Sequence, residues 1–230
     1  MLRKVTHPCV VTFMGPVGVG KSTQIALLEN YLESRNVKVR KTFIKSNHIF
    51  AFALGRLLIL LGARDEVRYS EGYAGIHPRG DLLRKLFSLL ILSDALSIVL
   101  KFFLAVCIPF RLGFTILIEE GPSMTQYTYR MYFPAVLKTA PRDPPMVKYL
   151  LAWIAHNKSA TIVLNATDDE LQKRRHRRGY RPQESSSYIS MQKQWLRQLN
   201  QENLLESETA SESMFITHKK IRDFVLKIMS

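Results

Sequence analysis

The sequence predicts a three-layer α/β protein, with helices on both faces of a parallel sheet of about five strands. Short apolar runs alternate along the chain with longer segments of helical periodicity. That alternation is typical of parallel strands joined by helical crossovers. The clearest runs are almost entirely apolar, as expected of strands buried on both faces.

The expected strands are the short apolar runs, which span residues 9–14, 37–44, 114–118, 160–164 and 214–217. The expected helices begin at Lys21, cover 49–61, 81–106 and 145–156, and close the chain up to Met229. We predict a polar connection over 62–80 and a solvated loop, rich in Ser and Glu, over 205–213.

Composition excludes several classes of protein. With 47% hydrophobic residues, 11 Gly and 10 Pro, the chain is neither disordered nor fibrous. We find no linker, so residues 1–230 are expected to form one domain. Cys9 and Cys107 are the only cysteines, which excludes a disulfide framework and a cysteine zinc site and indicates a reducing, cytoplasmic location. The net charge of 33 − 19 = +14 indicates an anionic partner.

The most membrane-like segment is 86–110, but Asp94 and Lys101 divide it into uncharged runs of 8, 6 and 9 residues. A spanning helix needs about 20 apolar residues, and each central charge costs about 2.5–3.5 kcal/mol. We therefore expect a buried helix of a soluble protein, without transmembrane insertion. No export signal is recognised at the N-terminus.

A phosphate-binding loop follows the first predicted strand and opens the first helix. It matches G-x-x-x-x-G-K-[ST] with Gly15, Pro16, Val17, Gly18, Val19, Gly20, Lys21, Ser22 and Thr23. In such a loop the backbone amides surround a polyphosphate, the lysine reaches its β- and γ-phosphates, and the serine ligates Mg²⁺. The sequence therefore predicts a P-loop NTPase type of fold that binds ATP and Mg²⁺.

An acidic pair follows the predicted strand 114–118. A P-loop requires an acidic group at the end of a neighbouring strand to hold the metal or its water. Glu119 leaves the strand first, so it is the metal-ligand candidate beside Ser22, and Glu120 is the alternative. A solvated strand end is the other interpretation.

An arginine-rich segment occupies residues 167–181. Thr167 and Glu170 form a capping box that opens a helix, and the arginines beyond it are Arg174, Arg175, Arg177, Arg178 and Arg181. The guanidinium fork suits phosphate, so we interpret the segment as a lid. A polyanion-binding patch and a solvated charged face remain alternatives. A GTPase is excluded because Asn157-Lys158 lacks the aspartate of N-K-x-D and precedes its strand.

The order of these motifs resembles the thymidylate kinase branch of the nucleoside monophosphate kinases. In that family a P-loop precedes a long helical region, an acidic motif and a strand that leads into an arginine-rich lid. Ser93-Asp94-Ala95 resembles the family's Ala-Asp-Arg motif, with alanine in the place of the arginine. Where the family has Asp-Arg-Tyr/Trp, with an arginine that helps to bind the acceptor phosphate, this chain has Glu119-Glu120-Gly121.

The resemblance implies transfer of the γ-phosphoryl group of Mg-ATP to a nucleoside monophosphate in nucleotide biosynthesis, with thymidylate as the leading acceptor. It places the acceptor region at about 45–110 and the lid at about 168–185. The lid arginines would be Arg174, Arg175 and Arg178. In the acceptor region, Arg56 resembles an acceptor-phosphate arginine. Asp94 contacts the acceptor or pairs with a cation such as Lys101, and Tyr127 stacks on a base or packs in the core.

Two further functions remain open. The altered acceptor motif and the charge of +14 allow a kinase that acts on nucleic-acid ends or on another phosphorylated metabolite. A nucleotide-binding regulatory or nucleic-acid-binding protein with weak catalysis is the third reading, and it predicts salt-sensitive polyanion binding. A small-molecule nucleotide is the preferred partner, nucleic acid is less favoured, and a homodimer is left open.

Overall fold

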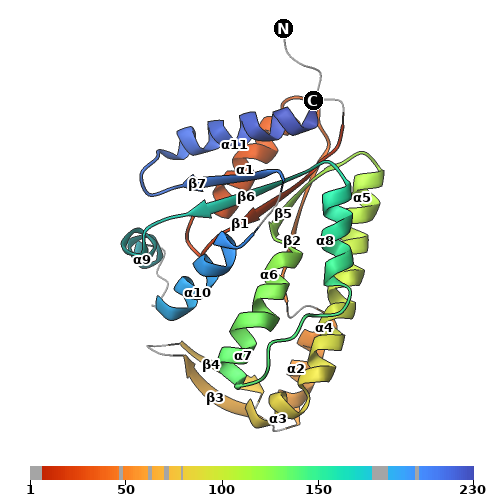
Figure 1. The fold of residues 1–230 in the computed structure, drawn as a ribbon, viewed down its shortest axis with the longest axis vertical. Helices are drawn as coiled ribbons and strands as arrows, with labels where there is room; N and C mark the ends of the chain where they lie inside the picture. The colour runs from red at the N-terminus through yellow and green to blue at the C-terminus, as the bar shows by residue number, and fades with distance from the viewer. Residues whose placement is uncertain are drawn as a thin grey trace.

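The computed structural model describes residues 7–46, 49–61, 64–69, 73–78, 80–177, 186–199 and 202–230. A five-stranded sheet lies at its centre (Figure 1). The strands are β1 (Val10–Met14), β2 (Val39–Ile44), β5 (Thr115–Glu120), β6 (Ser159–Asn165) and β7 (Leu204–Glu208). Their order is β2-β5-β1-β6-β7, and every pairing between them is parallel. The predicted α/β fold class is confirmed.

Helices cover both faces of the sheet (Figure 1). On one face lie α1 (Lys21–Glu33) and α11 (Met214–Met229), and on the other lie α4 (Phe87–Phe102), α6 (Pro122–Tyr127), α8 (Val147–His156) and α10 (Ser186–Arg197). Ile25, Leu28 and Leu32 recur at helical spacing, and all three are buried between α1 and the sheet. Ile98, Phe102 and Val106 are buried against the opposite face.

Seven further helical elements are described. They are α2 (Ile49–Leu60), α3 (Gly80–Lys85), the π-helix η1 (Phe103–Cys107), α5 (Ile108–Arg111), the π-helix η2 (Thr128–Tyr132), α7 (Phe133–Leu137) and α9 (Asp168–Arg177). The segments α4, η1 and α5 form one continuous helical run from Phe87 to Arg111. α6, η2 and α7 likewise form one continuous helical run from Pro122 to Leu137.

The predicted order of elements is wrong near the C-terminus. The segment expected to be a solvated loop contains β7, which pairs with β6 at the sheet edge. An edge strand tolerates Glu and Ser because one of its sides faces solvent, so its composition resembles that of a loop. The segment 214–217 was predicted as a strand but opens α11, because Ser213 caps that helix by accepting a hydrogen bond from the Ile216 amide.

The predicted polar connection over 62–80 is also wrong in part. It contains an antiparallel hairpin of β3 (Arg64–Tyr69) and β4 (Tyr73–Pro78), whose backbones pair from Arg64–Pro78 to Tyr69–Tyr73. Charged residues interrupt β3 and a glycine interrupts β4, so the apolar alternation that signals a strand is weak.

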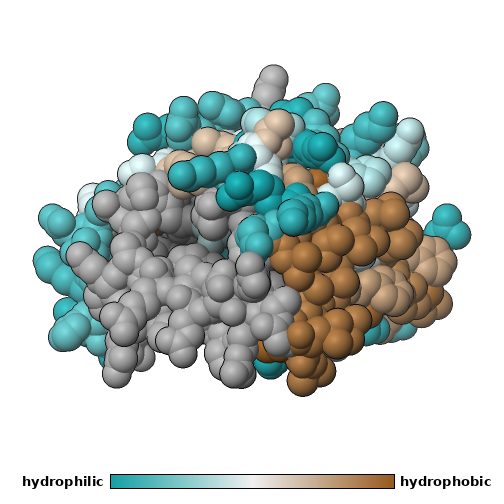
Figure 2. Space-filling view, turned by 90° about the horizontal axis from the view of Figure 1, so that it is seen from below, coloured by the Kyte–Doolittle hydropathy of each residue, from teal (hydrophilic) through white to brown (hydrophobic). Residues whose placement is uncertain are grey.

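An extended apolar surface lies on the face of the molecule shown in Figure 2. The exposed apolar side chains of α2, α4 and η1 are Ile49, Phe50, Phe52, Leu57, Leu60, Leu89, Leu92, Leu96, Leu100, Phe103 and Leu104. Among the described residues, one helical run, Phe87–Arg111, is long and apolar enough to cross a membrane by length and composition. Its other side packs on the sheet through Phe102 and Val106.

Candidate functional site

The phosphate loop begins where β1 ends. Gly15 has a φ of 144°, and a Cβ at this position would lie 2.3 Å from the backbone oxygen of Leu164, so glycine is required there. α1 begins at Lys21, with Gly20 as its N-cap and no side-chain hydrogen bond to the cap. The uncapped N–H groups and the helix dipole suit an anion.

Lys21 is held at the phosphate loop by several oxygen atoms. Its side chain is only 5% exposed, and Nζ donates to the backbone oxygens of Gly15 at 2.7 Å and Pro16 at 3.2 Å. The same Nζ lies 3.4 Å from Oε1 of Glu120. The ammonium group is therefore fixed between the loop and the end of β5.

The two glutamates at the end of β5 contact two adjacent residues of the phosphate loop. Ser22 Oγ donates to Glu119, at 3.2 Å from Oε1 and 3.3 Å from Oε2. Glu120 is buried and contacts Lys21 instead. Successive side chains of a strand point in opposite directions, which explains the division. Glu120 also has a φ of 77°, which is uncommon for a residue other than glycine.

A second lysine completes this group of charges. Lys45 follows β2, and its Nζ lies 3.4 Å from Oε2 of Glu120. The register of the sheet accounts for the contact, because Ile44 at the end of β2 pairs with Glu120 at the end of β5. One buried carboxylate therefore lies between two ammonium groups, and together with Glu119 the formal charges beside the phosphate loop balance.

Arg174 connects α9 to the phosphate loop from the other side. Its guanidinium donates to Glu170 Oε1 at 2.8 Å, to Val19 O at 3.3 Å, and to Thr209 Oγ1 and O at 2.9 and 2.6 Å. Thr209 Oγ1 is also 3.1 Å from both Val19 O and Asn165 O. The structure thus brings one predicted lid arginine to the phosphate loop.

The acceptor region contains a buried polar pair. Tyr129 donates its hydroxyl hydrogen to Asp94 Oδ2 at 2.8 Å, and both residues are buried. Burial raises the pKa of the Tyr129 phenol far above its usual value, and the neighbouring Asp94 carboxylate raises it further. Asp94 is thus hydrogen-bonded to a phenol, and both of its predicted roles, contact with the acceptor and pairing with a cation such as Lys101, stay predictions.

The other two predicted acceptor residues lie apart from the phosphate loop contacts. Arg56 is on the exposed side of α2, with its guanidinium over the ring of Phe52 at 5.3 Å from the centroid. Tyr127 is 1% exposed and packs in a core cluster, with its ring 6.4 Å from that of Trp195. Their contacts with an acceptor stay predictions.

Comparison with solved structures identifies the fold. The thymidylate kinase from Candida albicans superposes on 97% of this chain and 94% of its own, with 12% sequence identity and a TM-score of 0.55. This chain has the thymidylate kinase fold. The thymidylate kinase from Ehrlichia chaffeensis is similar over 95% and 98% of the two chains, with 15% identity and a TM-score of 0.50.

A third solved structure widens the comparison. The YorR protein from Bacillus subtilis, solved in complex with phosphorylated GDP, covers 94% of this chain and 95% of its own, with 14% identity and a TM-score of 0.52. No family model matches the sequence, and a search of curated proteins found no match. Sequence identities of 12–15% establish the fold alone. The function is therefore inferred from the side chains at the site.

The predicted lid is described only in part. α9 begins at Asp168 and contains Arg174, while residues 178–185 lie outside the described residues, and so does the predicted lid residue Arg178. The side chain of Arg175 is not described either. The proposed clamping role of these two arginines stays a prediction.

The oxygen atoms of Ser22 and Glu119 fit the predicted magnesium ion. Mg²⁺ prefers hard oxygen ligands and is usually held by one or two protein groups together with substrate phosphates and waters. Ser22 and Glu119 supply a hydroxyl and a carboxylate that already touch. No cluster of three or more His, Cys, Asp or Glu side chains suited to a metal occurs in the described part of the chain.

Sequence reasoning missed the contributions of Lys45 and Thr209 to this site of the thymidylate kinase fold. Lys45 follows a strand that was predicted correctly, so its position beside Glu120 could have been inferred from the β2–β5 pairing had the strand order been known. Thr209 follows β7, a strand that the sequence did not predict. No sequence signal available here would have placed it against Val19.

Proposed function

We propose that this protein is an ATP-dependent phosphotransferase of the nucleoside monophosphate kinase type, with thymidylate as the leading acceptor. The observation that carries the proposal is the contact of Ser22 with Glu119 beside a buried Lys21. A hydroxyl, a carboxylate and an ammonium group at a helix N-terminus are the groups that position a magnesium-bound triphosphate.

In this proposal each part of the site has one task. Phosphoryl transfer needs the donor and acceptor in line while cations offset the charge on three equatorial oxygens. Bound Mg-ATP supplies the phosphoryl group. Lys21 and the loop amides bind its β- and γ-phosphates, and Ser22 and Glu119 orient the metal side. Arg174, once it exchanges its contacts with Glu170 and Thr209 for the phosphate, stabilises the transferring group together with Arg175 and Arg178. Arg56 and Asp94 serve the acceptor region.

The two cysteines are consistent with a cytoplasmic enzyme. Cys9 is fully buried and Cys107 is partly buried, and both are free thiols. Free thiols persist in a reducing compartment. A soluble, cytoplasmic location is therefore part of the proposal.

The direct test replaces the loop lysine. Lys21→Met keeps most of the side-chain volume and removes the ammonium group, so ADP formation with a nucleoside monophosphate is expected to fall about 10³-fold. Lys41→Met is the matched control, because Lys41 lies on exposed β2 and pairs with Glu29. A coupled ADP-release assay measures both variants, and circular dichroism checks that they fold.

The control should keep the rate of the unmodified protein. If a folded Lys21→Met protein also kept that rate, the donor site would be misplaced and the proposal would fail.

A second candidate function is favoured by Glu120. The carboxylate lies next to Lys21 and occupies the motif position at which the thymidylate kinase family has its acceptor-phosphate arginine. A carboxylate repels an acceptor phosphate but can accept a proton from a hydroxyl. This observation favours an acceptor hydroxyl, such as the 5′ end of a nucleic acid.

A panel of acceptors separates the two functions. ADP release is measured with thymidylate, the other nucleoside monophosphates and a 5′-hydroxyl oligonucleotide. Turnover with a monophosphate alone supports the first function, and turnover with the oligonucleotide alone supports the second. Salt-sensitive oligonucleotide binding without any ADP release would instead indicate a regulatory nucleotide-binding protein.

A further inference from the structure

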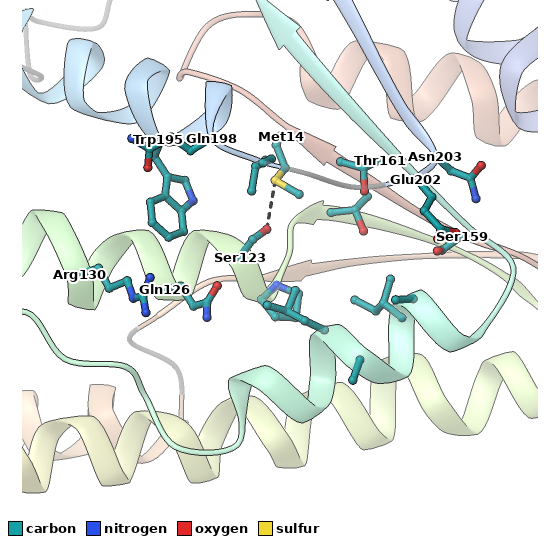
Figure 3. Close-up of a pocket in the computed structure, with 17 residues that line it drawn as sticks. Met14, Ser123, Gln126, Arg130, Ser159, Thr161, Trp195, Gln198, Glu202 and Asn203 are labelled. Atoms are coloured by element: carbon teal, nitrogen blue, oxygen red, sulfur yellow. Dashed lines mark hydrogen bonds between the residues drawn. The ribbon is translucent and has the colours of Figure 1, made fainter.

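A cavity of about 620 Å³ lies beneath the sheet, between α6, α8 and α10 (Figure 3). Cavities of about 300–1,000 Å³ hold small organic ligands in proteins. The described lining residues include none of the phosphate loop residues 15–23, and neither Glu119 nor Glu120. The cavity is therefore distinct from the candidate phosphotransfer site.

The cavity is also separate from the acceptor side of the helix that forms its wall. Pro122, Gln126 and Arg130 line the cavity and recur every four residues, so they share one face of the α6–η2 helix. Thr128 and Tyr129 contact Ser46 and Asp94 in the acceptor region. The helix thus separates the two regions.

The floor of the cavity carries hydroxyl groups where a buried sheet normally carries apolar side chains. Thr12 on β1 and Thr161 on β6 are register partners, and both are less than 5% exposed. Ser159, two residues before Thr161, lies on the same face of β6 and also lines the cavity. Val10 precedes Thr12 on that face of β1 and packs in an ordinary apolar cluster. Parallel strands covered by helices are typically apolar on both faces, so the hydroxyls indicate a polar occupant.

Trp195 on α10 gives an independent indication. The residue is only 9% exposed, and its buried indole Nε1–H has no hydrogen-bond partner among the residues that the structure describes. In Figure 3 the nitrogen edge of the ring faces Met14 and Ser123 across the cavity. Buried donors are nearly always paired, since an unmade hydrogen bond costs about 1–3 kcal/mol. Nε1 is closed to a water-sized atom as the ring lies, so a ligand with an acceptor atom would supply the missing partner once the ring turns toward the cavity.

The charges of the lining favour an uncharged ligand. Arg130 is the only cation among the described lining residues, and it donates two hydrogen bonds of 2.5 Å to Asp143. Glu202 supplies a carboxylate at the opposite end. A phosphate would therefore meet a satisfied arginine and an acid, in spite of the net charge of +14. The apolar walls, which include Met14, Pro122 and Leu199, suit a flat ring.

We propose that the cavity between α6, α8 and α10 binds an uncharged nucleoside, whose ring carbonyl or ring nitrogen accepts a hydrogen bond from Trp195 Nε1. The hydroxyls of the floor and the side chains of Gln126 and Asn203 bond its remaining polar atoms. This site is additional to the proposed donor and acceptor sites, and its occupation does not depend on phosphotransfer.

Trp195 itself reports on binding. The chain has two tryptophans, and Trp153 packs edge-on against Phe102 and Phe110 at ring distances of 5.4 Å. Trp153→Phe keeps an aromatic ring there and leaves Trp195 as the single indole. Thymidine, uridine, adenosine and guanosine are titrated into this variant. At least one is expected to change the Trp195 emission saturably at submillimolar concentration.

A filling substitution locates the site. Ala155 lines the cavity from α8, so Ala155→Phe places a ring in it, and the response is expected to disappear. Ala140→Phe, at an exposed position outside the lining, is the matched control and should keep the response. Ala152→Phe is a second filling variant in case Ala155→Phe does not fold.

The donor is tested separately by calorimetry. Trp195→Phe keeps an aromatic ring but removes Nε1–H, so the affinity for the responding nucleoside is expected to weaken about fivefold. Three results would overturn the proposal. The first is no response to any nucleoside at 10 mM, about a hundredfold above typical affinities. The others are a fluorescence response that survives in both folded filling variants, and tighter binding of the matching monophosphate than of the nucleoside at this site.

Discussion

Glu120 is the buried member of the acidic pair beside the phosphate loop. It is buried, it lies 3.4 Å from the ammonium groups of Lys21 and Lys45, and its backbone has a φ of 77°. Backbone strain of this kind costs about 1–3 kcal/mol and is concentrated at functional sites. A residue held in this way, next to the catalytic lysine that we propose, is a candidate determinant of which acceptor the enzyme accepts.

Glu120→Gln removes the charge and keeps the shape. If the acceptor is a monophosphate, its KM is expected to fall about tenfold, because one repulsive charge is lost near a phosphate. If the acceptor is a hydroxyl, kcat/KM is expected to fall at least about 10²-fold, because a proton acceptor is lost. Steady-state kinetics with both acceptors measures the change.

Glu206→Gln is the control for Glu120→Gln, because Glu206 lies on exposed β7. If Glu120→Gln had the same KM and kcat/KM as Glu206→Gln with either acceptor, Glu120 would not face the acceptor.

At the scale of elements, α9 and the turn after β7 are joined to the phosphate loop by one hydrogen-bonded group. Arg174 and Thr209 both contact Val19 O, and Arg174 also contacts Glu170 one turn earlier in α9. The phosphate loop follows β1 and contains several glycines. Hydrogen bonds from α9 and from the turn after β7, both distant in the sequence, restrain it.

Thr209→Val tests this connection. The substitution keeps the shape but removes a hydroxyl that accepts from Arg174 and lies 3.1 Å from two backbone oxygens. The free energy of unfolding is expected to fall by about 1–3 kcal/mol. The affinity for Mg-ATP should weaken as well. Urea denaturation and calorimetry measure the two quantities.

Ser211→Ala is the control for Thr209→Val, since Ser211 lies in the same turn but is exposed and makes a long bond of 3.5 Å to Glu208 O. An unchanged ATP affinity in Thr209→Val would show that the loop does not need this restraint.

At the scale of the whole molecule, the cavity and the phosphate loop share their supports. Met14 lines the cavity and precedes Gly15, and Pro122 lines it and follows Gly121. Ser123 Oγ donates to Met14 Sδ at 3.2 Å, which joins the two supports (Figure 3). A ligand in the cavity would contact the segments that carry the phosphate loop and the acidic pair.

This arrangement predicts coupling between the two sites. A nucleoside bound in the cavity should order Met14 and Ser123, so Mg-ATP is expected to bind about fivefold tighter in its presence. The nucleoside should gain the same factor from Mg-ATP, because equilibrium coupling is reciprocal. Calorimetric titration of each ligand with and without the other measures both factors.

Ala155→Phe should abolish the effect of the nucleoside on Mg-ATP binding. Affinities that are independent in the unmodified protein would exclude the coupling.

The sequence by itself determined the features that depend on local pattern. The runs that became β1, β5 and β6 lie in the sheet interior, where both faces are buried and every position favours an apolar residue. The phosphate loop could be placed because its glycines, Lys21 and the start of α1 are adjacent in the chain. The acidic pair at the end of β5 followed from the same reasoning.

The tertiary structure alone decided the features that depend on distant partners or on exposed positions. β7 was missed because an edge strand with one solvated side has the composition of a loop. The contact of Ser22 with Glu119 joins residues 97 positions apart. The pairing of β2 with β5 brought Lys45 to Glu120, and three helices enclosed the cavity. These contacts depend on strand order and packing, which local patterns do not specify because they describe only neighbours along the chain.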